Sequence, residues 1–144
     1  MKVLFVCRSN GARSQIAEVF FKKLSNHAVK SAGIDVAKAS WLSNYLPASQ
    51  NVEMMRKAFG IDISKKMRKQ VTQAMLEKAD RVVILMSHSE RKKLLPKYFD
   101  KYSDKTVFWN MKDMRNVKSN LPLIKRAKRI EGLVQKLIKE NDST

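Results

Sequence analysis

Residues 5–21, FVCRSNGARSQIAEVFF, contain the only cysteine of the chain, and this segment decides the fold that we predict. An apolar run ends at Cys7, and a run with helical spacing begins at about Ser14. Asn10 and Gly11 lie between them, and both residue types favour turns. The pattern predicts a buried strand, a short loop and an amphipathic helix, with a thiol at the junction.

Short apolar runs continue to alternate with amphipathic runs along the chain. Strands are expected at 3–6, 29–31, 81–86 and 106–109, and helices at 14–24, 51–59, 72–78, 89–95 and 121–140. For the second helix we expect Asn51 as the N-cap, Glu53 in the first turn and Gly60 just after the last turn. This order predicts an α/β fold with a four-stranded parallel sheet and helices on both faces, formed by a single domain over residues 1–144.

Composition limits the class of protein further. The 30 Lys and Arg residues against 13 Asp and Glu give a formal net charge of +17, spread along the chain. Such a surface attracts anions, so we weigh weak non-specific nucleic-acid binding against a merely solvated basic surface. A single cysteine excludes an internal disulfide and a Cys-rich zinc site, and His27 and His88 lack ligand spacing. We expect no metal, no cofactor, no membrane span and a cytoplasmic location.

The junction at Cys7 has the parts of an anion site. Ligands of parallel sheets bind beyond the carboxyl ends of the strands, where Cys7 falls. Amides at a helix start, the Arg13 guanidinium and the Ser14 hydroxyl favour negative charge there, including a thiolate. Gly11 can take a positive φ without steric cost, and Asn10 tolerates one better than most residues, so that the loop can bend around a tetrahedral oxyanion. The predicted phosphate-binding loop between the first strand and the first helix comprises Arg8, Ser9, Asn10, Gly11, Ala12, Arg13 and Ser14.

A plainer interpretation of this cysteine is open. A lone cysteine at a strand end is most often a small buried hydrophobic side chain. The conjunction of a strand, Cys7, an Asn-Gly loop, Arg13 and an amphipathic helix favours the functional interpretation over the structural one.

The motif Cys7-x5-Arg13-Ser14 resembles the phosphate loop of the low-molecular-weight protein tyrosine phosphatases, whose fold the thioredoxin-linked arsenate reductases share. The resemblance implies that Cys7 is a nucleophile that forms a cysteinyl-phosphate intermediate. It implies that Arg13 holds the equatorial oxygens, Ser14 donates to the thiolate and Asn10 holds the loop in shape. Similar segments extend over nearly the whole chain, at Ser31–Gly33, Phe59–Ser64, Lys69–Thr72 and Ala79–Met86.

The resemblance also implies a general acid in a late loop, usually an aspartate followed by proline. Asp113 has the matching spacing after the last expected strand, and it would protonate the leaving oxygen and then activate water. Met114 stands where proline is expected, and Asp104 is a weaker candidate for the acid. Trp41 and Tyr45 fall in a segment that borders the substrate cleft in the family, with packing onto the core as the alternative.

The resemblance leaves several functions open. We expect an enzyme, a phosphomonoester hydrolase acting on phosphotyrosine in protein. The first alternative is a single-cysteine arsenate reductase in which an external thiol or glutaredoxin resolves arsenylated Cys7, since later cysteines are absent. The second is a weakly catalytic basic protein that binds phosphate or nucleic acid, motivated by Met114 and the charge of +17. The expected partner is a phosphorylated protein or a small oxyanion.

Overall fold

The computed structural model describes residues 1–37, 45–114 and 117–142. These residues contain one parallel sheet with the spatial order β2-β1-β3-β4. Its strands are β1 (Lys2–Cys7), β2 (Ala28–Gly33), β3 (Arg81–Leu85) and β4 (Thr106–Trp109). The predicted fold class is confirmed. Since β1 lies inside the sheet, the predicted anion loop begins at the middle of the carboxyl edge.

Burial explains the sequences of the two inner strands. Residues 3–7 of β1 are at most 2% exposed, and residues 82–85 of β3 are fully buried. A parallel strand covered on both faces reads as a continuous apolar run, which is what both strands show. The edge strands β2 and β4 are more exposed and carry polar residues, so their signals in the sequence are weaker.

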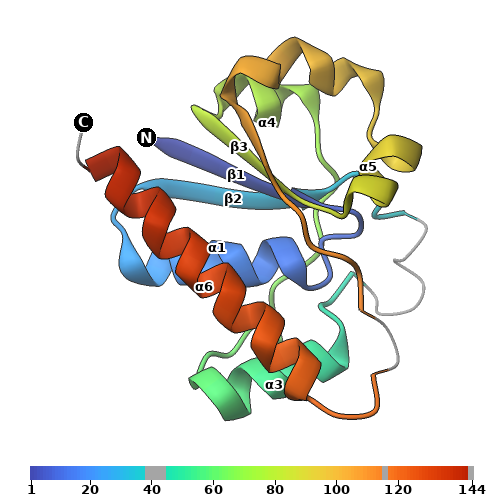
Figure 1. Cartoon of the computed structure of the whole chain (residues 1–144), viewed down its shortest axis with the longest axis vertical. Helices are drawn as coiled ribbons and strands as arrows, with labels where there is room; N and C mark the ends of the chain where they lie inside the picture. The colour runs from blue at the N-terminus through green and yellow to red at the C-terminus, as the bar shows by residue number, and fades with distance from the viewer. Residues whose placement is uncertain (38–44, 115–116, 143–144) are drawn as a thin grey trace.

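Helices cover both faces of the sheet (Figure 1). One face carries α1 (Arg13–Leu24), α3 (Ser49–Phe59) and α6 (Leu121–Asp142). The other face carries α4 (Gln73–Lys78), α5 (His88–Leu94) and a 3-10 segment, Lys97–Lys105. α1 packs against β1, β2 and α6, so the helix that follows the anion loop is held by the sheet and by the closing helix. In the described ranges, no helix combines the length and apolar character that a membrane span requires.

The start of α3 differs from the prediction. The helix begins at Ser49 with Ala48 as its N-cap, so the assignment of Asn51 as the N-cap is wrong and Glu53 lies beyond the first turn. Asn51 is 3% exposed and its side chain has a partner through space, because its Oδ1 accepts a hydrogen bond from Arg126. The 3-10 segment was not predicted, because a tight helix of this kind leaves no apolar period of 3.6 residues.

α3 ends where the sequence predicted. Gly60 has a φ of 67°, and its amide donates to the carbonyl of Arg56 while the amide of Ile61 donates to that of Met55. The left-handed conformation at this position is strained for any residue with a Cβ.

We expect Gly60→Ala to lower the free energy of unfolding by about 1–2 kcal/mol, because alanine disfavours the left-handed region. Urea denaturation measures the change. The control is Gly132→Ala in α6, where a Cβ also meets open space but φ is not positive. This control should stabilise the protein by up to about 1 kcal/mol, through helix propensity alone. Equal effects of the two substitutions would contradict the assignment of Gly60.

Candidate active site

The thiol lies at the base of the loop that joins β1 to α1. Cys7 is the last residue of β1 and is 1% exposed. Its Sγ lies 3.0 Å from the Oγ of Ser14, in the first turn of α1. No side chain caps α1 at Ala12, so the amides at the start of the helix are available to a bound anion.

The carbonyl groups of the loop point outward. Those of Cys7, Arg8 and Gly11 accept hydrogen bonds from the amides of Ile34, Asp35 and Ala48, at 3.1, 2.9 and 3.0 Å. In a trans peptide the carbonyl and the amide of the next residue point in opposite directions. The amides of Arg8, Ser9 and Ala12 are therefore directed toward the inside of the loop, which is the arrangement of an anion-binding nest.

The positive φ in the loop belongs to Asn10, at 55°, and not to Gly11. Asn10 is fully buried, and its side chain ties the loop to three places. Its Nδ2 donates to the Oγ of Ser14 at 2.7 Å and to that of Ser31 at 3.0 Å, and its Oδ1 accepts from the amide of Lys69 at 2.9 Å. These bonds fix the strained residue and thereby the shape of the loop.

Gly11 allows the side chain of Arg68 to approach the loop closely. A Cβ at this position would lie 2.8 Å from each of Cζ, Nη1 and Nη2 of Arg68. Equal distances to three atoms mean that the guanidinium presents its flat face to the loop. The Nε of Arg68 donates to the carbonyl of Leu46 at 2.8 Å, which keeps the group in place. Arg68, which the sequence did not single out, therefore adds a cation beside the anion nest.

The donors and acceptors in the hydrogen bonds around Asn10 can be identified. Ser31 Oγ donates to Glu18 Oε1 at 2.7 Å, and both hydrogens of the Asn10 amide go to serine oxygens. Ser14 Oγ accepts one of them, and its own hydroxyl hydrogen can be donated to the sulfur of Cys7.

Arg13 is held in one orientation. It is 3% exposed, and its Nη1 and Nη2 donate to the two carboxylate oxygens of Glu90 at 2.7 and 3.1 Å. Its Nη1 also donates to the carbonyl of Met111 at 2.8 Å. Burial alone would lower the pKa of Arg13, but the negative charges of Cys7 and Glu90 outweigh it and hold the pKa above its usual value. Arg13 is therefore a fixed cation next to the thiol.

Glu90 was not identified from the sequence, although a signal was present. Ser87 and Glu90 form a capping box at the start of α5: Glu90 Oε1 accepts from the amide of Ser87, whose Oγ accepts from the amide of Glu90. Ser-x-x-Glu is visible in the sequence, but it specifies a helix start and not the partner of Arg13. The pairing depends on how α5 packs beside the loop.

The other predicted residues lie as follows. Asp113 is partly buried in the loop after β4, and its charge acts on both Arg13 and Glu90, so the fold brings it near that pair. Asp104 precedes β4, at the opposite end of that strand. Tyr45 is 44% exposed, in the segment that leads to Ala48. Trp41 lies outside the described residues.

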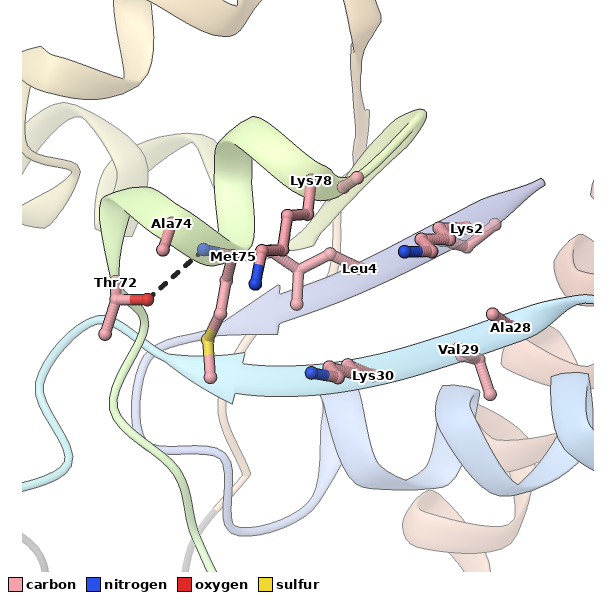
Figure 2. Close-up of a pocket in the computed structure, with 11 residues that line it drawn as sticks. Lys2, Leu4, Ala28, Val29, Lys30, Thr72, Ala74, Met75 and Lys78 are labelled. Atoms are coloured by element: carbon pink, nitrogen blue, oxygen red, sulfur yellow. Dashed lines mark hydrogen bonds between the residues drawn. The ribbon is translucent and has the colours of Figure 1, made fainter.

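A separate groove of about 310 Å³ lies away from this loop. Figure 2 shows Lys2 and Leu4 of β1, Lys30 of β2, and Met75 and Lys78 of α4 around it. Its lining includes no residue of the segment 7–14, so the groove is not part of the candidate active site.

Comparisons with known proteins agree with this geometry. The sequence model of the family described as low molecular weight phosphotyrosine protein phosphatase matches residues 2–122. A low-molecular-weight protein tyrosine phosphatase from T. tengcongensis is 31% identical, with a TM-score of 0.76 over 97% of this chain and 99% of that one. The structure of an arsenate reductase in its phosphate-binding state is 26% identical, with a TM-score of 0.76 over 96% and 97% of the two chains.

A relative found by sequence comparison is also an arsenate reductase. An arsenate reductase of Brevibacillus brevis is 34% identical over 90 residues, which are 61% of this chain. The match spans 60% of the length of that reductase.

The pairing with Arg13 predicts how stability depends on pH. Burial alone would raise the pKa of Glu90, but the hydrogen bonds with Arg13 hold it below its usual value. Such a carboxylate stabilises the fold above its ordinary pKa, and this contribution is lost as the pH falls through the lowered pKa. We expect Glu90→Gln to reduce the free energy of unfolding at neutral pH, and the deficit to shrink as the pH falls below about 4.

Denaturant titrations of both proteins at several pH values measure this deficit. The control is Glu53→Gln, which removes an exposed carboxylate paired with Lys57 and should change stability little. A deficit for Glu90→Gln that stays constant down to the most acidic condition would contradict the ion pair.

Proposed function

Because the chain belongs to the low-molecular-weight phosphotyrosine protein phosphatase family, we propose that it is a phosphomonoester hydrolase acting on phosphotyrosine in protein. The observation that carries the proposal is the sulfur of Cys7 beside Ser14 Oγ, at the base of a loop with inward amides and the fixed cation Arg13. Amides and a guanidinium suit a tetrahedral dianion, which needs donors on several sides. The 31% identical neighbour named as a tyrosine phosphatase supports this substrate class.

In the first step Cys7 acts as the nucleophile. Its thiolate attacks the phosphorus of the monoester, so that the S–P bond forms while the P–O bond to the tyrosine oxygen breaks. Asp113 gives its proton to that oxygen, which leaves as neutral tyrosine. Arg13 and the inward-directed amides of the loop hold the equatorial oxygens, on which the negative charge is spread in the transition state.

In the second step water replaces the sulfur. Asp113, now a carboxylate, takes a proton from the water as its oxygen bonds to phosphorus. The S–P bond breaks, inorganic phosphate leaves and the thiolate of Cys7 returns. The hydrogen of the Ser14 hydroxyl stabilises the departing sulfur, which is the role that its 3.0 Å distance from Sγ supports.

Arsenate reduction is the second candidate, and two observations favour it. The relative of Brevibacillus brevis is named an arsenate reductase, and Cys7 is the only cysteine in the chain. Arsenate would occupy the same loop, where the sulfur of Cys7 displaces one oxygen as water. Reduction to arsenite needs two electrons, which Cys7 and one external thiol supply by forming a mixed disulfide. A second external thiol then reduces that disulfide and releases Cys7.

Turnover with and without a thiol tests the proposal. We expect the protein to release phosphate from an aryl phosphate and from a phosphotyrosine peptide when no thiol is added, because the hydrolytic cycle uses no electrons. Arsenite formation from arsenate, measured with and without glutathione, tests the second candidate. Activity that is confined to the arsenate reaction with thiol would select the reductase over the hydrolase.

Cys7→Ser separates binding from chemistry. We expect this variant to lose aryl phosphate hydrolysis, because serine is a far weaker nucleophile at neutral pH, and to bind inorganic phosphate with little change, because the amides and Arg13 remain. Calorimetric titration with phosphate measures the binding. Turnover retained in Cys7→Ser would refute the assignment of the nucleophile.

A further inference from the structure

The backbone that leads to Asp113 is held by arginines. The carbonyls of three successive residues between β4 and Asp113 each accept a hydrogen bond from a guanidinium. Arg129 Nη1 donates to Asn110 O at 3.0 Å, Arg13 Nη1 to Met111 O at 2.8 Å and Arg126 Nη1 to Lys112 O at 3.2 Å. Carbonyls of a loop usually pair with amides or water, so three charged donors on one short segment fix it more firmly than a loop requires.

One of these arginines occupies an unfavourable position for a cation. Arg126 is 5% exposed and its Nε has no hydrogen-bond partner in the described part of the chain. Burial, followed by the charge of Arg13, lowers the pKa of Arg126 to about 10. A buried cation with an unsatisfied donor destabilises a fold in comparison with an apolar side chain of similar size. Fold stability therefore does not explain an arginine at this position, whereas the hydrogen bonds of Arg126 do.

The contacts of Arg126 connect the loop that carries Asp113 to α3 and α6. Its Nη2 donates to Asn51 Oδ1 in α3 at 3.3 Å, while its Nη1 holds the residue just before Asp113. Arg129 follows three positions later on α6, so both guanidinium groups extend from neighbouring positions of one long helix. α6 packs against α1, which begins at Arg13. The position of segment 110–112 is thus fixed relative to α1, the helix that follows the anion loop.

The sequence shows why such a restraint is needed. In the family that the chain resembles, the acid is usually followed by proline, and here Met114 takes that place. Proline fixes its own φ and restricts the conformation of the residue before it, which would be the acid. Methionine imposes neither restriction.

We propose that Arg126 and Arg129 are positioning residues, and that together with Arg13 they form an arginine clamp that replaces the missing proline and aims Asp113 at the leaving oxygen. The inference rests on the proposed hydrolase function. Arg13 belongs both to the clamp and to the anion site, so the position of Asp113 is fixed relative to the group that would hold the phosphate.

The first test is Arg126→Met. We expect kcat/KM for phenyl phosphate, which reports the step in which the leaving group departs, to fall by about 10- to 100-fold, because a small displacement of a catalytic group has an effect of this order. The loss should be much smaller for 4-nitrophenyl phosphate, whose leaving group needs no proton, and Asp113→Asn should show the same dependence on the leaving group. The melting temperature should change little, because methionine removes a buried charge but leaves Asn51 Oδ1 and the Lys112 carbonyl without this donor. Equal losses on both substrates would overturn the proposal.

The second test uses an exposed residue and a rescue. Arg129→Ala should show the same leaving-group dependence in a weaker form, and Arg129 can be replaced without disturbing the core because it is exposed. Met114→Pro in the Arg129→Ala background should restore most of the activity on phenyl phosphate. A double variant no more active than Arg129→Ala would contradict the substitution of clamp for proline.

The control is Lys105→Met, which removes a cation that donates to the carbonyl of Ala79 at 2.6 Å, at the opposite end of β4. It should change kcat by less than about twofold on either substrate, as expected for a substitution far from the chemistry. Hydrogen–deuterium exchange of segment 110–114 tests the clamp without turnover. We expect faster exchange in Arg126→Met and Arg129→Ala and not in Lys105→Met. A wild type that hydrolyses no aryl phosphate removes the proposed function, while unchanged exchange removes the clamp.

Discussion

The paired guanidinium of Arg13 is the interaction on which the candidate site depends. It lies at the first residue of α1, and it joins that helix to α5 through Glu90 and to the loop after β4 through the carbonyl of Met111. Taking a cation out of water is strongly unfavourable unless it is paired, and a two-pronged carboxylate is the partner that best matches a planar guanidinium. The same pairing fixes the plane of the group. Arg13 thereby holds together parts of the chain that are far apart in sequence, close to Cys7.

The loop itself is stabilised by a different balance. Asn10 has a left-handed backbone, which costs about 1–2 kcal/mol for a residue with a side chain. Its three side-chain hydrogen bonds, two of them buried and one partly buried, contribute about 1 kcal/mol each, so they exceed this cost and fix the shape of the loop. A loop that is shaped in advance loses little conformational entropy when an anion enters. The strain at Asn10 is therefore part of the preparation of the site and not a defect of the fold.

The fold could be predicted because the burial of strands and helices produces recognisable patterns in the local sequence. The apolar runs of β1 and β3 and the helical period of α6 each specify an element without knowledge of the rest of the chain. The loop could be predicted because Cys7, Arg13 and Ser14 lie within one short segment. The partners that orient these groups could not be predicted in the same way. Glu90 lies 77 residues from Arg13, and Asn51 lies 75 residues from Arg126. Such pairs are set by packing, which also explains why Asn51 was mistaken for a cap: a local rule was applied to a side chain with a distant partner.

The charges around the site are unequal. Burial, followed by the charge of Arg13, lowers the pKa of Arg126, whereas the negative charges of Asp113, Cys7 and Glu90 raise it without restoring the usual value. Two buried guanidinium groups thus repel each other. A tetrahedral dianion in the loop would lie next to Arg13 and offset part of this repulsion, so the binding of the proposed substrate would stabilise both arginines. Arg126 and Arg13 also hold successive carbonyls before Asp113, so the charges that would attract the proposed substrate also hold the segment that carries the proposed acid.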